Sequence, residues 1–242
     1  MSTFLRTGTS VVLLYHRLGM VKFGSLVAGQ YVAPRLFASQ LDCLNSRGWE
    51  HSALHEIIDL DRSGREDQYG VTFDDGYLSV YEHACPALSA RGMSATIYVV
   101  ANSIGGINEW DKRAGDREER MMSAAQVREL ADSGFEIGSH TLTHPRLTEL
   151  NDTDLDEEIA GSKHKLEDLT GKEVRSFSYP YGDYDNRVLR AVVAAGYSSA
   201  VSTRLGVVKD GASVFEIPRV NVRWNAFGPL LMRKIHRAER SP

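Results

Sequence analysis

Short apolar runs rich in valine and isoleucine alternate along the chain with longer segments in which apolar residues recur every three or four positions. The first pattern predicts buried strands, and the second predicts amphipathic helices. We expect strands near residues 11–16, 70–73, 94–100, 135–141, 174–179, 198–203 and 214–222, and helices near 34–47, 79–91, 124–133, 152–170 and 186–195. About seven strands that alternate with helices are typical of a parallel α/β fold.

Local signals mark the ends of several expected helices. Four of them stop at a glycine that is followed at once by a large residue, namely Gly48, Gly92, Gly134 and Gly196. Glycine just past the last turn is the usual left-handed terminator. Ser123 with Gln126 has the form of a capping box at a helix start.

Two stretches have no clear period. Residues 17–33 carry several glycines, and we interpret them as a loop. Residues 101–122 form one long connection that is charged from Asp111 to Arg120. Such a run is more often a solvated loop than a lid or a substrate-binding loop. After Gly48 the strand-like pattern is weaker than after the other three terminating glycines, and Ile57–Ile58 is consistent with a short helix instead.

Length and charge limit the possible classes of protein. A chain of 242 residues is long enough for one large domain, so we expect a single domain over residues 1–242. A hydrophobic content of 42% with 25% charged residues is ordinary for a globular protein. The net charge of -4 gives no reason to expect nucleic acid or an anionic membrane as a partner.

Two further features bear on the cellular compartment. Cys43 and Cys85 are the only cysteines, and both fall in helical patterns, so buried thiols are expected rather than a disulfide framework. The early apolar run from Val11 to Leu14 is too short for a signal-peptide core or a membrane span. We therefore expect a cytoplasmic protein, although a chain trimmed of a leader would look the same.

Candidate chemistry begins where the strand near 70–73 ends. Asp74 and Asp75 follow it directly, at the strand end where parallel α/β folds place their active sites. Adjacent residues on an extended strand point to opposite sides, so the two carboxylates suit two tasks, one as a metal ligand and one as a base. The competing interpretation is that one aspartate caps the next helix and the other is solvated.

A second pair of candidates, His140 and His144, follows the strand near 135–141. Pro145 and the preceding strand argue against a helix that would carry both histidines on one face. Two imidazoles with one carboxylate make a three-ligand metal site that leaves positions open for water and substrate. The alternative is a surface loop or a hydrogen-bonded core pair.

The third candidate is the turn in Phe177–Gly182, which again follows a strand-like run. Its Pro180-Tyr181-Gly182 sequence allows close approach of the backbone to a ligand, and the Tyr181 N–H could donate to an oxyanion. A plain turn is the simpler interpretation.

Together, Thr72-Phe-Asp-Asp-Gly76, His140-Thr-Leu-Thr-His144 and Phe177-Ser-Tyr-Pro-Tyr-Gly182 resemble the first three motifs of the polysaccharide deacetylase family, the NodB-homology or carbohydrate esterase 4 domain. The resemblance spans about residues 10–225. It implies a distorted (β/α) barrel of about seven parallel strands, a divalent metal ion with Zn²⁺ expected, and removal of acetyl groups from sugars.

Carried over by motif, the resemblance implies roles for individual residues. Asp75, His140 and His144 would bind the metal ion, and Asp74 would be the catalytic base that takes a proton from water. The Tyr181 N–H would face the oxyanion.

The sequence departs from the family pattern in three motifs. Ser178 stands where many members have the arginine that holds the base, and Arg219 could supply that function from another strand end. The alternative for Arg219 is a surface arginine. The Asp-Trp pair of the fourth motif is not recognisable, so Trp224 would replace only its aromatic wall. The histidine of the fifth motif, which serves as general acid, is at best His236 in an amphipathic C-terminal segment.

The opening Tyr15-His16-Arg17 is similar to a subgroup that trims poly-N-acetylglucosamine and exopolysaccharide intermediates. There His16 would lie beside the site as a second acid or an orienting group, with a buried structural histidine as the alternative. We expect a deacetylase whose partner is an N-acetylated sugar or glycan. The alternatives are an amide hydrolase of this fold that acts on a small non-glycan molecule and a degenerate, non-catalytic glycan-binding domain.

Overall fold

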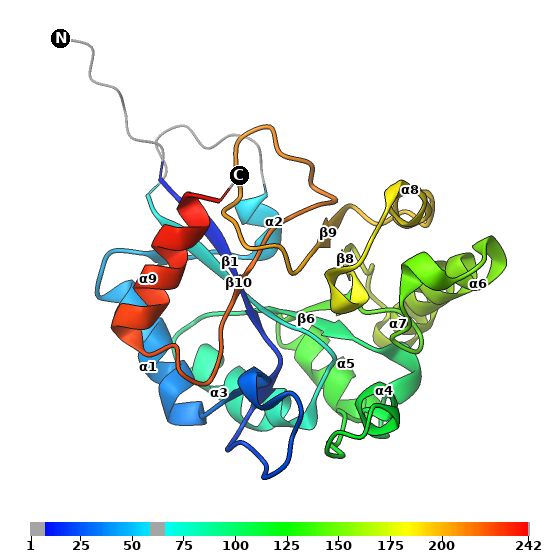
Figure 1. The fold of residues 1–242 in the computed structure, drawn as a ribbon, viewed down its shortest axis with the longest axis horizontal. Helices are drawn as coiled ribbons and strands as arrows, with labels where there is room; N and C mark the ends of the chain where they lie inside the picture. Colours follow the sequence, from blue (N-terminus) through cyan, green and yellow to red (C-terminus); the bar gives the residue numbers. More distant parts are fainter. Residues whose placement is uncertain (1–7, 59–65, 242) are drawn as a thin grey trace.

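A curled parallel sheet forms the centre of the protein, and a computed structural model describes it over residues 8–58 and 66–241 (Figure 1). The neighbouring strands follow the order β10-β1-β5-β6-β7-β8-β9, and β4 pairs separately with β5. The strands are β1 (Ser10–Tyr15), β4 (Glu50–His51), β5 (Gln68–Phe73), β6 (Thr96–Val99), β7 (Glu136–Ser139), β8 (Ser176–Ser178), β9 (Ser199–Val201) and β10 (Val220–Asn221). Every pairing between them is parallel, which confirms the expected fold class.

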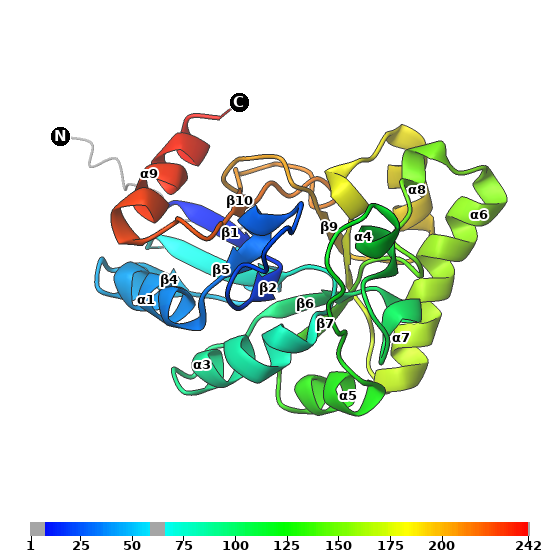
Figure 2. The ribbon, with the colours of Figure 1, turned by 60° about the horizontal axis from the view of Figure 1, so that its bottom comes forward.

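Helices connect the strands and cover the outside of the sheet, where α1, α3, α5 and α7 follow one another (Figure 2). The α-helices are α1 (Pro34–Asn45), α2 (Leu54–Ile57), α3 (Cys85–Ser89), α4 (Glu109–Arg113), α5 (Ala124–Asp132), α6 (Asp152–Asp156), α7 (Ser162–Thr170), α8 (Asn186–Ala194) and α9 (Gly228–Glu239). Wider π-helical turns, η2 (Val80–Ala84) and η5 (Glu157–Gly161), precede α3 and α7. Short 3-10 turns are η1 (Ala28–Gln30), η3 (Ala101–Ser103), η4 (Leu147–Glu149) and η6 (Pro180–Gly182).

Both faces of the sheet are buried, which is why the strands have continuous apolar sequences rather than alternating ones. In β1, Val11 and Leu13 belong to the large cluster that packs beneath the helices. Val12 lies between them in sequence and belongs to a smaller cluster with Tyr98 and Val201. Because successive strand side chains point to opposite faces, this second cluster fills the inside of the curl.

The predicted helix signals are confirmed. The Ser123 side chain accepts from the Gln126 N–H, and the Gln126 side chain accepts from the Ser123 N–H. The four terminating glycines all have positive φ angles, between 66° and 90°. Cys43 and Cys85 are both free thiols.

Three segments differ from expectation. Residues 101–122 are not simply a loop, because they contain η3 and α4. Residues 17–33 are not simply a loop, because β2 (Arg17–Leu18) and β3 (Tyr31–Val32) form a small parallel ribbon there. Residues 214–222 form only the two-residue strand β10 and a single bridge from Ile217 to Val201. Pro218 lies between the two, and its missing N–H prevents a continuous ladder.

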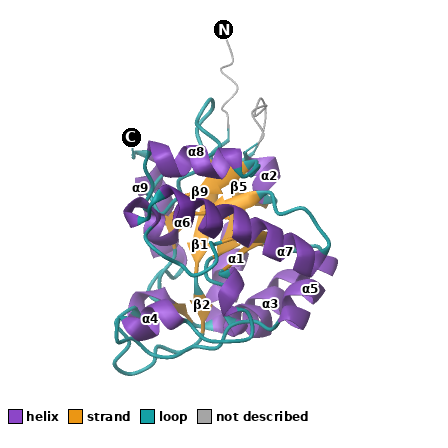
Figure 3. Cartoon of the chain, turned by 90° about the vertical axis from the view of Figure 1, so that its right-hand side faces the viewer, coloured by secondary structure: helices purple, strands orange, loops and turns teal. Residues whose placement is uncertain are grey.

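The ribbon β2–β3 and α4 lie at the same end of the sheet (Figure 3). This is the end at which β1 leaves the sheet toward β2. Among the residues that the structure describes, no helix is long and apolar enough to cross a bilayer. The single-domain extent and the cytoplasmic location stay predictions.

Candidate active site

The carboxyl ends of β5 and β7, which lie on either side of β6 in the sheet, bring two of the three motifs together. Asp75 comes just after β5, and His140 follows β7. The Nε2 atoms of His140 and His144 lie 3.4 and 3.5 Å from Oδ1 of Asp75. One ligand atom from each of these three buried residues lies within 4.8 Å of the other two. The arrangement matches a two-histidine, one-carboxylate metal site.

Backbone strain is concentrated in the three motifs. In the described part of the chain, four non-glycine residues have positive φ angles, namely Asp75 (76°), Thr141 (67°), His144 (63°) and Tyr181 (60°). A left-handed conformation costs such residues on the order of 1–3 kcal/mol each, and it persists only where the surroundings enforce it. Each of these positions therefore turns the backbone sharply at the site itself.

The environment of the cluster shifts the pKa values of all three residues. Burial opposes ionisation of Asp75, but a hydrogen bond with His140 and the charge of His144 outweigh burial and lower its pKa. Burial, together with the charge of His140, lowers the pKa of His144 to about 3. Burial also disfavours the charged form of His140, but Asp75 and Asp74 outweigh it and raise that pKa. His144 thus presents a neutral imidazole, the form that binds a metal ion.

The His140 ring has a defined tautomer. Its Nδ1 lies 2.7 Å from the carbonyl oxygen of Ser178, and since a carbonyl oxygen only accepts, Nδ1 carries the proton. Nε2 is consequently the ring atom directed at Asp75, and it becomes free to bind a metal ion once it has lost its proton. A backbone partner of this kind is a common way to orient a metal-binding imidazole.

Asp74 forms a bidentate pair with Arg219. The Nη1 and Nη2 atoms of Arg219 donate to Oδ1 and Oδ2 of Asp74, both at 2.7 Å. The predicted contact between these two residues is therefore confirmed. Burial works against the charge on Asp74, but the guanidinium outweighs it and keeps the pKa of this carboxyl lowered.

Ser178 lies where the family pattern has its arginine. Its Oγ donates to Oδ2 of Asp74 at 3.2 Å and accepts from Nη2 of Arg219 at 3.1 Å. The remaining donors of Arg219 reach Oγ1 of Thr72 at 3.1 Å and the carbonyl of Ser202 at 2.9 Å. The guanidinium thus takes over the contact with the carboxylate, and the serine completes the network.

The other residues predicted for the site are His16, Tyr181, Trp224 and His236, and not all of them lie near the metal-site cluster. His16 directly follows β1, and its Nδ1 is buried without a hydrogen-bond partner among the described residues. The pKa of His16 is lowered, because the effect of burial exceeds the opposing effect of the charges of Asp75 and Asp74.

The remaining three predicted residues lie at different distances from the cluster. Tyr181 packs edge-on against His144, with ring centroids 4.6 Å apart. Trp224 is 57% exposed. His236 is exposed on α9 and pairs with Glu239 rather than with the cluster.

Sequence reasoning missed Trp110. Its ring stacks on His144, with centroids 4.6 Å apart and an interplanar angle of 24°. The residue lies on α4, inside the charged connection that the pattern assigned to a loop. An aromatic residue within a charged surface run was the signal that could have identified it.

Residues 61–200, more than half of the chain, match the sequence model of the family described as polysaccharide deacetylase. The chain belongs to this family. It is 28% identical over 211 residues to YxkH of Bacillus subtilis (strain 168), which bears a polysaccharide deacetylase name, and the match covers 85% of this chain and 71% of that protein.

Two further relatives match more than nine-tenths of the length of this chain. The poly-beta-1,6-N-acetyl-D-glucosamine N-deacetylase of Staphylococcus epidermidis is 25% identical over 244 residues, which are 92% of this chain and 82% of that protein. The solved structure of IcaB from Ammonifex degensii is 27% identical and superposes with a TM-score of 0.78, over 96% of this chain and 99% of that one. The expected barrel-like deacetylase fold is thus confirmed.

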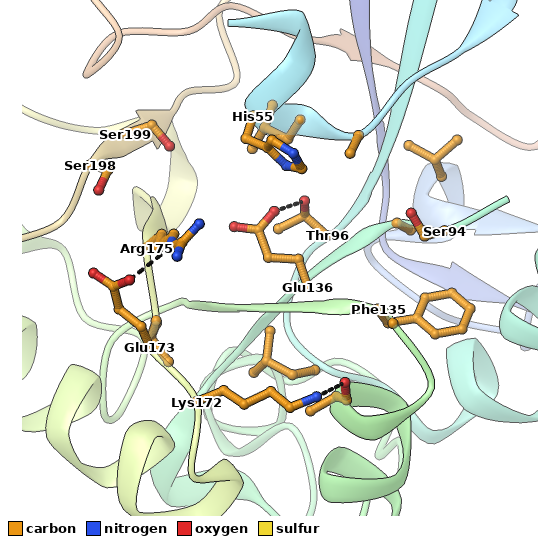
Figure 4. Close-up of a pocket in the computed structure, with 18 of the residues that line it drawn as sticks. His55, Ser94, Thr96, Phe135, Glu136, Lys172, Glu173, Arg175, Ser198 and Ser199 are labelled. Carbon is orange, nitrogen blue, oxygen red and sulfur yellow. Dashed lines mark hydrogen bonds and ion pairs between the residues drawn. The ribbon is translucent and has the colours of Figure 1, made fainter. Parts of the chain in front are cut away.

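A cavity of about 390 Å³ opens at the amino ends of the strands, opposite the carboxyl ends that carry the cluster of Asp75, His140 and His144. The starts of β6, β7 and β9 contribute to its lining (Figure 4). Glu136 accepts from Thr96 and Ser176, Arg175 donates to Glu173, and Lys172 donates to the carbonyl of Ala131. These charged groups already have partners, and the cavity lies apart from the metal-site cluster.

We predict that Arg219→Ala lowers the free energy of unfolding by about 3–5 kcal/mol, because it leaves the charge of Asp74 buried and unpaired. Urea unfolding followed by circular dichroism measures this loss. In the unmutated protein the folded pKa of Asp74 is depressed, so the stabilisation by this pair is present above pH about 3.9 and is lost as the pH falls through the folded value. Arg175→Ala, which removes an exposed pair with Glu173, is the control and should change stability by less than about 1 kcal/mol. Equal stability of the two variants would contradict the prediction.

Proposed function

We propose that this chain is a metal-dependent deacetylase that removes the N-acetyl group from an amino sugar in a glycan. The observation that carries the proposal is the position of the Asp75–His140–His144 cluster beside a carboxylate, Asp74, that Arg219 keeps charged. The name of the Staphylococcus epidermidis relative makes poly-beta-1,6-N-acetyl-D-glucosamine the first substrate to test.

The donor set suits a divalent ion, and Zn²⁺ is the expected one because two neutral imidazoles and a carboxylate are ligands that zinc accepts. Bound there, the ion would lower the pKa of a water molecule and polarise the acetyl carbonyl. Three protein ligands leave room in the coordination sphere for both.

The protein's own groups then handle the proton and the developing charge. Asp74 is ionised and can accept a proton from the attacking water. The Arg219 fork fixes the plane of this carboxylate, so its basic oxygens stay oriented. The Tyr181 N–H, on a turn with φ of 60°, is our candidate donor to the oxyanion. Trp224, exposed beyond β10, is proposed as a contact for the sugar.

The leaving amine needs a proton, and we assign its delivery to His16 rather than to His236. His16 follows β1 and lies within the electrostatic influence of Asp75, Asp74 and Arg219. His236 is exposed and pairs with Glu239 on its own helix.

The metal ligands can be tested without substrate. His140→Ala should abolish stoichiometric metal binding after dialysis, as measured by elemental analysis. In the unmutated protein, metal affinity should fall as the pH drops below neutral, because the raised pKa of His140 lets protons compete for that imidazole. Retention of a full equivalent of metal by His140→Ala would remove His140 from the ligand set.

The base can be separated from the ligands. Asp74→Asn keeps the size of the side chain but cannot accept a proton, so the metal should stay bound while kcat falls by about 10²–10⁴-fold. Asp75→Asn is the matched variant and should instead lose the metal. The reverse result would mean that the two aspartates have exchanged roles.

The substrate class is tested by release of acetate from β-1,6-linked N-acetylglucosamine oligomers, with an aryl acetate as a generic acyl substrate. We expect release from both. Cleavage of the aryl acetate alone would favour an amide or ester hydrolase that acts on a small molecule. Binding of the oligomer without release of acetate from either substrate would indicate a glycan-binding domain.

A further inference from the structure

The two histidines of the cluster are held in different ways. His140 has a backbone carbonyl on its second ring nitrogen, which sets its orientation. The Nδ1 of His144 is buried and has no hydrogen-bond partner among the described residues. A metal-binding imidazole usually needs such a partner, because without it the ring rotates about its side-chain bonds. Another contact must therefore fix the His144 ring.

Aromatic rings make that contact. The Trp110 indole stacks on one side of the imidazole, and the Tyr181 ring meets it edge-on, both with centroids 4.6 Å away. The Arg146 guanidinium covers the Tyr181 ring at 4.4 Å and pairs with Asp183. We call Trp110 and Tyr181 the aromatic clamp. Stacked and edge-on rings of this kind favour one orientation of the imidazole.

Trp110 comes from a connection that an ion pair with the buried Arg17 holds in place. Next to it, Oδ2 of Asp111 accepts from Nη2 of Arg17 at 2.5 Å, from the Tyr77 hydroxyl at 2.9 Å and from Nδ2 of Asn108 at 3.0 Å. The bonds from Arg17 and Tyr77 hold α4 against the carboxyl ends of β1 and β5, while Asn108, the N-cap residue of α4, donates from within the connection itself. The position of Trp110 therefore follows from that of Asp111.

Arg17 is itself enclosed. It is 1% exposed, and its guanidinium lies over the rings of Tyr31 and Tyr77, 5.1 and 4.3 Å from their centroids. The Tyr31 hydroxyl donates to Glu119 at 2.6 Å, so the far end of the same connection is also attached to the β2–β3 ribbon. The ribbon and α4 lie together at this end of the molecule (Figure 3). A charge buried this deeply marks a fixed contact rather than a solvated loop.

We propose that the Arg17–Asp111 pair is a latch that positions Trp110, and that Trp110 orients the His144 imidazole for metal binding in place of a hydrogen bond. Arg17, Asp111 and Trp110 are positioning residues, since they act through His144. The inference deepens the proposed metal-dependent function and rests on it. It also assigns a role to the charged connection.

Metal affinity in the absence of substrate tests the proposal, measured by competition with a chromophoric chelator. Trp110→Ala should weaken binding of Zn²⁺ about tenfold, at the low end of the range for groups that orient metal ligands. Trp110→Phe keeps a stacking ring and should recover most of this loss. Asp111→Asn should fall between Trp110→Ala and the unmutated protein. The matched control is Lys112→Met, a change on the same helix as Trp110, which breaks an exposed pair with Glu118 and should leave the affinity unchanged.

Hydrogen exchange of the metal-free protein gives a second readout. Asp111→Asn should speed exchange across residues 107–120, and Trp110→Ala should speed it across 140–146, while Lys112→Met should do neither. Unchanged metal affinity and exchange in Trp110→Ala would overturn the clamp, and unchanged exchange in Asp111→Asn would overturn the latch. If the unmutated protein bound no metal, the proposed function would fail, and exchange alone would then decide whether the clamp exists. If Asp111→Asn did not fold, the two Trp110 variants would carry the decision.

Discussion

The buried pair of Asp74 and Arg219 is the interaction on which the site depends. A lone carboxylate at this depth would take up a proton rather than stay charged, since burial disfavours the ionised form. The fork meets both carboxylate oxygens, and its other donors reach Thr72 and Ser202. Each nitrogen of the guanidinium therefore donates to at least one acceptor, and because of these bonds the pair can remain ionised inside the sheet.

Arg219 also spans the opening of the curled sheet. The strand order ends at β10 on one side and at β9 on the other, and a single bridge between Val201 and Ile217 joins the segments there. Arg219 directly precedes β10, and Ser202 directly follows β9. The Nε bond from Arg219 to the Ser202 carbonyl therefore holds the two sides of the opening together while the fork holds Asp74. The side chain of Arg219 thus orients the carboxylate and also adds to the backbone bonds that join Ile217 to Ala200 and Ser202 across the opening.

Much of this site could be predicted because its parts are local in sequence. Strand patterns placed Asp74, Asp75 and His140 at the ends of parallel strands, and parallel strands put those ends on one edge. Arg219 was predictable since an apolar run ends just before it. The aromatic clamp was not, because Trp110 reaches His144 from a run with no apolar period, and the Arg17–Asp111 bond joins residues 94 positions apart. The β2–β3 ribbon escaped prediction since strands of two residues leave no period to detect.

The neighbouring aspartates show how backbone geometry separates two identical side chains. Asp75 has a φ of 76°, which turns its carboxylate toward the imidazoles of His140 and His144 while that of Asp74 faces the guanidinium. Both pKa values are lowered, but an arginine does this for Asp74, and the histidines do it for Asp75. An arginine keeps its proton at neutral pH and cannot bind a metal ion, whereas an imidazole can lose its proton and bind one. The partner of each carboxylate, more than the carboxylate itself, therefore determines which of the two is available as a ligand.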